Sequence, residues 1–76
     1  MATDDKRLDA LRRNPRDVRS DELDAVLVGA GFRSRQRGTS HKVYSRGAVT
    51  LVIPQHRPYL KAVYVRQALQ VLEEET

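Results

Sequence analysis

The sequence predicts a small α+β protein in which two helices pack on one face of a three-stranded antiparallel sheet. Two observations carry this prediction. Residues 20–30 and 65–72 place apolar side chains at helical spacing, and residues 32–53 form alternating runs typical of strands. A chain of 76 residues allows one domain, which we expect to span residues 1–76 as an N-terminal segment (1–19) and a core (20–76). The order α-β-β-β-α then gives a two-layer sandwich.

Along the chain, one helix is expected before the strands and one after them, and a further short helical segment near the N-terminus. A weak signal in residues 4–13 predicts a short helical segment, which Asn14-Pro15 ends. Ser20 is predicted to cap the next helix, and Gly29 and Gly31 to let that helix end in a left-handed turn. The buried stripes of the two core helices are Leu23, Val26, Leu27 and Ala30, and Val65, Ala68, Leu69 and Leu72.

Three strands are expected between these helices, over residues 32–37, 40–46 and 49–53. The first two alternate strictly, and the third is rich in β-branched residues. Arg46-Gly47 marks a tight hairpin turn, and Pro54 ends the last strand.

The alternation also predicts which side chains face the helices. With Phe32, Val43 and Leu51 on the core side, the opposite face presents five bases and one aromatic: Arg33, Arg35, Arg37, Lys42, Tyr44 and Arg46. This parity puts His41 on the side of Val43, opposite Lys42 and Arg46. We therefore expect His41 at the sheet margin, looking past a helix end into a groove, although a bulge near Thr39 would also reverse the faces.

Positive charge is concentrated in the middle of the chain. The formal net charge is +4, yet residues 1–24 sum to −1, residues 25–72 contain eight bases and no acid, and residues 73–75 are all glutamate. Bases clustered in this way attract polyanions, so nucleic acid is the leading partner. A solvated surface of a basic protein is the alternative. The glutamates lie at the end of the last helix that the helix dipole disfavours, and we assign them no role.

Composition restricts the other classes of protein. The chain contains 39% hydrophobic and 32% charged residues, as a folded soluble domain does, and no cysteine for disulfides or thiolate metal sites. No apolar run approaches the roughly 18 residues that a membrane span needs, and the start lacks the apolar region of a secretory signal. We expect a cytoplasmic protein without membrane association.

Three motifs follow one another along the core: Gly31-Phe32, Gly38-Thr39-Ser40-His41-Lys42-Val43-Tyr44 and Leu51-Val52-Ile53-Pro54-Gln55-His56. This ordered set resembles the HicA family of type II toxin–antitoxin mRNA interferases, and the resemblance extends over about residues 8–74. It implies a fold like that of double-stranded RNA-binding domains, an order of elements that the prediction above shares. It also implies a toxin of the stress response that cleaves mRNA as a metal-independent endoribonuclease without cofactor, and a HicB-like antitoxin protein as partner. Thr39, which separates Gly38 from Ser40, departs from the simpler family pattern.

His41 is the catalytic residue that the resemblance implies. RNA cleavage without metal needs a base for the 2′-OH proton and an acid for the leaving 5′-oxygen, and histidine, with a pKa of about 6.5, suits both roles. Alone, such a histidine is more often an ordinary polar residue at a strand start. The expected substrate-binding residues, which hold phosphate by charge or by close backbone approach, are Arg33, Arg35, Arg37, Gly38, Ser40, Lys42 and Arg46. His56 is either a secondary acid or base, or a surface loop residue.

Two questions stay open at this point. Tyr44, Tyr59 and Tyr64 are either stacking platforms for unpaired bases or packing residues. The function has two alternatives to a ribonuclease: a non-catalytic RNA-binding module of the same fold, or a protein-interaction domain whose basic face meets an acidic partner.

Overall fold

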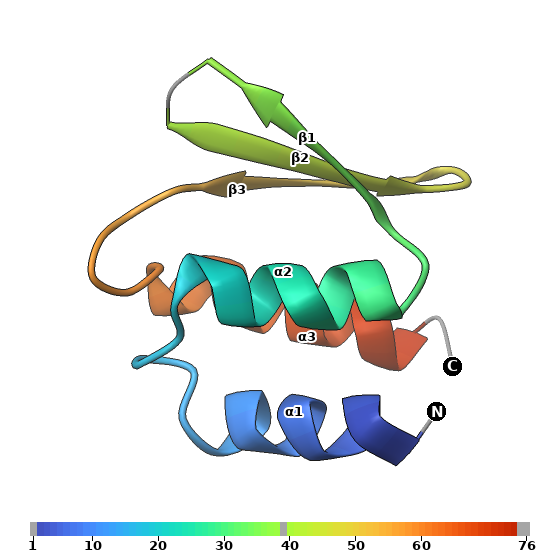
Figure 1. Ribbon diagram of the computed structural model, residues 1–76, viewed down its shortest axis with the longest axis vertical. Helices are drawn as coiled ribbons and strands as arrows, with labels where there is room; N and C mark the ends of the chain where they lie inside the picture. The colour runs from blue at the N-terminus through green and yellow to red at the C-terminus, as the bar shows by residue number, and fades with distance from the viewer. Residues whose placement is uncertain (1, 39, 75–76) are drawn as a thin grey trace.

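In the computed structural model, a three-stranded antiparallel sheet is covered on one side by helices (Figure 1). The structure describes residues 2–38 and 40–74. The elements in chain order are α1 (Ala2–Arg13), α2 (Ser20–Gly29), β1 (Arg33–Arg37), β2 (His41–Arg46), β3 (Val49–Pro54) and α3 (Ala62–Glu74). The predicted order α-β-β-β-α of the core is confirmed, with α2 and α3 on the same face of the sheet.

The N-terminal segment forms a helix of 12 residues, longer than the short segment expected over residues 4–13. α1 packs against α2 and α3 on the side away from the sheet, and so adds a third layer (Figure 1). Leu11 joins the hydrophobic core from this side. Arg12 forms a salt bridge of 3.7 Å with Glu73, which ties the acidic end of α3 to α1. Both side chains are largely exposed, so this pair adds little stability.

α2 begins without the predicted serine cap. Ser20 is already the first helical residue, and Arg19 takes the cap position. The Arg19 backbone N–H donates to the Glu22 carboxylate at 3.0 Å, which satisfies one of the free donors at the helix start. The Ser20 hydroxyl instead donates to the side-chain carbonyl of Gln55. The N-cap prediction is therefore wrong, because Ser20 is used in a contact between α2 and the loop after β3.

The end of α2 follows the prediction for Gly31. This glycine has φ +97°, and its N–H donates to the Val28 carbonyl at 3.0 Å. The Phe32 N–H donates to the Leu27 carbonyl, also at 3.0 Å, which completes the Schellman pattern. Phe32 and Leu27 are both buried. A glycine is needed here because a side chain is strained at this φ.

The sheet is a meander in the order β1-β2-β3, and each strand lies within a residue or two of its expected range. Arg46 pairs with Val49, so the second hairpin closes over residues 47–48, where the sequence predicts a turn. In the first hairpin, Arg37 pairs with His41. The described pairs run regularly from there, without a bulge, and Thr39 itself lies outside the described residues.

The prediction for the faces of β2 is wrong. Tyr44, which is 1% exposed, pairs with Leu51 and belongs to the core cluster. Val43 is buried too, but it lies on the opposite face between its cross-strand partners Arg35 and Val52. The core therefore takes the side chain with the larger apolar body and leaves the smaller valine outside. The phenol hydroxyl donates to the half-buried carboxylate of Asp24 in α2.

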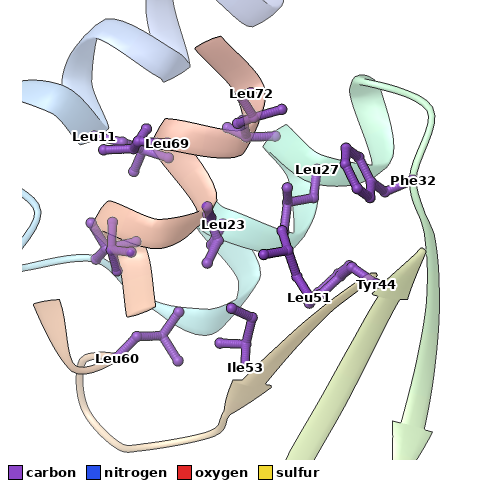
Figure 2. Packing of buried hydrophobic residues seen from close by; sticks show 14 residues of the cluster. Leu11, Leu23, Leu27, Phe32, Tyr44, Leu51, Ile53, Leu60, Leu69 and Leu72 are labelled. Atoms are coloured by element: carbon purple, nitrogen blue, oxygen red, sulfur yellow. The ribbon is translucent and has the colours of Figure 1, made fainter. Parts of the chain in front are cut away.

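The core lies between the sheet and the pair α2–α3 (Figure 2). The predicted stripes of both helices are buried, except that Ala30 is only half-buried against the cluster. Leu27, Phe32, Leu51 and Leu69 meet in this cluster as expected, without Val43. Across residues 2–38 and 40–74, no helix combines the length and apolar character needed to cross a membrane.

Candidate nucleic-acid interface

The face of the sheet away from the helices carries a row of arginines. Arg33, Arg35 and Arg37 alternate along β1 and pair with Ser45, Val43 and His41 of β2. Because paired residues share a face, all six side chains lie on what we call the open face. Every residue of β1 is exposed.

The positive charge of the open face comes from its three arginines. Residues two apart in a strand are about 7 Å apart on one face, so three like charges lie in a row. Of the salt bridges among the described residues, none involves Arg33, Arg35 or Arg37. The sequence contains no acid between residues 25 and 72 that could supply one. Charge on an edge strand also discourages sheet-to-sheet aggregation, but an unbalanced row attracts a polyanion.

His41 lies beside this row, at the start of β2. It is exposed on the open face, directly across the strand pair from Arg37, and the two line a hollow of about 290 Å³ together with Val52. The parity prediction for His41 and Val43 is confirmed, since both face the same side. That side is the solvent face, so neither a helix end nor a bulge is needed to expose His41.

The hydroxyl of Ser40 contacts the His41 imidazole. Its Oγ lies 3.1 Å from Nδ1. Either atom can donate, because neutral histidine carries its hydrogen on one nitrogen or the other. In both cases the contact fixes Nδ1 and leaves Nε2 as the nitrogen that can exchange a proton with a ligand.

Lys42 and Arg46 lie on the helix-facing side, in contrast to the prediction of one face with all the bases. Lys42 Nζ is 3.5 Å from the carboxylate of Asp24. Arg46 donates to the Ala30 carbonyl at 2.9 Å and lies 5.8 Å from the centre of the Phe32 ring. The structure thus brings three arginines together with His41 and directs the other two bases elsewhere.

Asp24 carries no functional prediction from the sequence, yet it joins two residues of β2. It accepts a hydrogen bond of 2.8 Å from the Tyr44 hydroxyl as well as the Lys42 contact. Burial, followed by the bond to Asp24, raises the pKa of Tyr44 well above its usual range. The only signal in the sequence is an acid one position from the apolar stripe of α2. Tyr44 is a packing residue, Tyr64 is half-buried against the core, and Tyr59 is partly exposed.

His56 lies in the loop between β3 and α3. Its Nδ1 is 2.9 Å from the Tyr59 carbonyl oxygen. A carbonyl only accepts, so Nδ1 carries the hydrogen, and Nε2 holds the lone pair of the neutral ring. His56 lines a hollow with Ser40 and Lys42, whereas His41 lines another. The hollow of about 290 Å³ is lined by His41 without His56, and the hollows of about 450 and 710 Å³ are lined by His56 without His41.

Comparison of this chain with protein-family models, with curated proteins and with solved structures gives no match. The resemblance to HicA toxins therefore stays a prediction.

Proposed function

We propose that this chain is an RNA-cleaving toxin that binds single-stranded RNA along the open face and cleaves it with His41. One observation carries the proposal: three arginines without ion-pair partners among the described residues lie in a row that ends beside an exposed histidine. Phosphates along the row would replace the missing counter-charges. A phosphate bound at Arg37 would come within reach of the His41 imidazole, since the two residues line one hollow.

The reaction is a transesterification within the RNA. The 2′-oxygen attacks the adjacent phosphorus, and the bond from phosphorus to the 5′-oxygen breaks, which leaves a 2′,3′-cyclic phosphate and a 5′-hydroxyl. His41 Nε2 accepts the 2′-OH proton or donates one to the leaving oxygen. The Arg37 guanidinium stabilises the extra negative charge on the non-bridging phosphate oxygens. No carboxylate from residues 25–72 is present to hold a hard cation, so these groups would act without metal.

The remaining parts of the proposal rest on the resemblance to HicA toxins. The cellular setting is a type II toxin–antitoxin system in the cytoplasm, with mRNA as the substrate. The partner is a HicB-like antitoxin, whose acidic surface would cover the open face. Such a contact would block both the arginine row and His41, which is a direct way to silence a preformed site.

A non-catalytic RNA-binding module is the second candidate. The observation in its favour is the hollow of His41, whose lining among the described residues includes no second acid or base besides Arg37. An arginine does not lose its proton in proteins, so His41 would have to serve both proton transfers, or share them with water.

The substitution His41→Gln tests the catalytic role. Wild-type protein expressed alone is expected to arrest growth and to cleave RNA in the presence of a chelator, leaving 2′,3′-cyclic phosphate ends. Loss of a general acid or base lowers the rate by about 10²–10⁴-fold, while circular dichroism and RNA affinity should stay near wild type. Gln67→Ala, at an exposed position of α3, is the control. Cleavage by His41→Gln at the wild-type rate would show that His41 is not the catalyst. RNA binding by the wild type without any cleavage would favour the binding module.

A further inference from the structure

A second hollow lies at the same end of the sheet as His41, on the helix-facing side. Its volume is about 450 Å³. It is lined by residues from the strand ends, the start of α2 and the loop after β3, among them Gln36, Ser40, Lys42, Gln55, His56 and Arg57. Ser40 connects this hollow with His41, because Ser40 lines the hollow and its hydroxyl contacts the His41 imidazole.

The lining favours an anion with a polar, planar part. None of its side chains is a carboxylate, two are cationic at neutral pH, and two are amides that both donate and accept. A larger hollow of about 710 Å³ adjoins it and shares Lys42, His56 and Arg57, but there Asp21 and Asp24 contribute negative charge. An anion is therefore favoured in the smaller hollow, which lies nearer the first hairpin.

The two amides are oriented by the protein. Gln55 donates from Nε2 to the Ile53 carbonyl at 2.9 Å and accepts from the Ser20 hydroxyl at its other end. Because the carbonyl only accepts, this arrangement fixes which end of the amide is nitrogen. Gln36 donates to the Gly38 carbonyl at 3.3 Å, which leaves its own carbonyl oxygen able to accept from a ligand. Fixed amides of this kind distinguish the edges of nucleobases.

The path between the open face and this hollow crosses the first hairpin. Gly38 has φ +66°, and beyond its chain neighbours no described atom lies within 4 Å of the position where a Cβ would be. A phosphate backbone can approach the main chain closely at such a glycine. A strand bound along Arg33, Arg35 and Arg37 would reach this point directly after passing His41.

We propose that this hollow is a nucleotide subsite, in which Gln36 and Gln55 read one base next to the cleaved bond. Lys42 and Arg57 hold the neighbouring phosphate, and His56 lines the hollow beside them. The inference rests on the proposed function, since it assigns the base preference of the same RNA strand. It also explains Ser20, whose contact with Gln55 keeps the reading amide in place instead of capping α2.

A binding experiment tests the subsite without cleavage. His41→Gln protein, labelled with ¹⁵N, is titrated with each of the four nucleoside 5′-monophosphates and with inorganic phosphate. We expect the side-chain amide signals of Gln36 and Gln55 to shift, with one nucleotide bound about three- to tenfold more tightly than the others. Equal binding of all four and of phosphate would overturn the assignment of base reading. The absence of shifts in these amides would overturn the subsite.

A cleavage experiment in the otherwise wild-type protein tests the same residues by substitution. Gln36→Leu and Gln55→Leu should each change the base preference next to the cut by about three- to tenfold, whereas Gln67→Leu on α3 should not. Unchanged preference in both variants, with cleavage intact, would overturn the inference and leave the ribonuclease standing. Amide shifts in the titration, together with a wild-type protein that does not cleave RNA, would instead overturn the ribonuclease and keep the subsite. If Gln55→Leu fails to fold, the titration still decides.

Discussion

Arg37 and His41 lie directly opposite each other across the first hairpin and point to the open face of the sheet. This pairing places a permanent cation beside an imidazole. A phosphate is the ligand that suits both groups, because it accepts hydrogen bonds from the guanidinium and exchanges protons with the ring. The pair is therefore the point at which binding and chemistry would meet.

The arginine row should control the salt dependence of RNA binding. Replacing Arg33, Arg35 and Arg37 with Gln removes the charges that face the phosphates. The slope of log affinity against log salt should become shallower by about 0.7 for each phosphate of single-stranded RNA that is no longer neutralised, or about 2 for all three. Fluorescence anisotropy over a series of salt concentrations measures this slope.

The matched control removes the same number of charges elsewhere. Arg7, Arg13 and Arg16 are exposed and lie in α1 and the segment after it. Their replacement with Gln lowers the net charge of +4 by three, as the substitutions in the arginine row do. The slope of log affinity against log salt should nevertheless stay nearly unchanged. Equal changes from both sets of substitutions would mean that the open face is not the RNA surface.

Arg46 should matter for stability and not for RNA binding. Arg46→Gln removes the hydrogen bond to the Ala30 carbonyl at the end of α2 and the contact with the Phe32 ring. We expect a loss of about 1 kcal/mol in the free energy of unfolding, because the bond is exposed. The salt slope should stay at the wild-type value. A slope reduced as much as by removal of one open-face arginine would place Arg46 in the interface after all.

Tyr44→Phe should change the response to alkaline pH. Below pH 10 the variant should be less stable by about 1 kcal/mol, since it lacks the bond to Asp24, whose side chain keeps Lys42 and some water as partners. The pKa of Tyr44 is raised in the folded protein, so above pH 10 the unfolded chain loses this proton first. Wild-type stability then falls by up to about 1.4 kcal/mol per pH unit relative to Tyr44→Phe.

Urea unfolding between pH 8 and 11 measures this difference. The two stability curves should cross between about pH 10 and pH 11, where the ionisation of the unfolded tyrosine offsets the missing hydrogen bond. Tyr59→Phe, at a partly exposed position, is the control and should follow wild type. A constant difference between wild type and Tyr44→Phe over this range would contradict the raised pKa of Tyr44 in the folded protein.

Two neighbouring glycines should respond to alanine in opposite directions. Gly31→Ala forces a side chain into φ +97° and should lower the free energy of unfolding by about 1–2 kcal/mol. Gly29 is the last helical residue of α2 and is exposed, so Gly29→Ala should raise it by about 0.5 kcal/mol. For a domain of this size, 1 kcal/mol corresponds to a Tm change of about 4–8 °C. A loss of stability in both variants would contradict the Schellman ending at Gly31.

The elements of the core could be predicted because local patterns determine them. The stripe of α3, the turn at Gly47 and the glycine after α2 each depend on neighbours within a few residues. The faces of β2 could not be predicted in this way, because Val43 lies on one face of the strand and Tyr44 on the other. Tyr44 enters the core, and its hydroxyl donates to Asp24, which lies 20 residues away in the sequence. Alternation alone carries no information on that contact.

The candidate site was predictable in part for the same reason. Arg33, Arg35 and Arg37 share a face whichever way the sheet turns, so their row follows from spacing two. The orientation of β2 decides which of its side chains lie beside the arginine row. It places His41 on the open face and Lys42 and Arg46 on the helix-facing side. The contact between Ser20 and Gln55 spans 35 residues and has no local signal, and so the hollow between them could not be foreseen.

The position of α2 behind the sheet has an electrostatic consequence for the approach of a ligand. The strands carry five bases and no acid, more positive charge than the whole chain's +4, so the remainder of the molecule is slightly negative. α2 carries three acids and no base, and it lies behind the sheet together with the glutamates that end α3 (Figure 1). The molecule therefore has a permanent dipole moment, and the field of a polyanion would exert a torque on it before contact. That torque turns the strands toward the polyanion, so a larger share of diffusional encounters begins in the productive orientation.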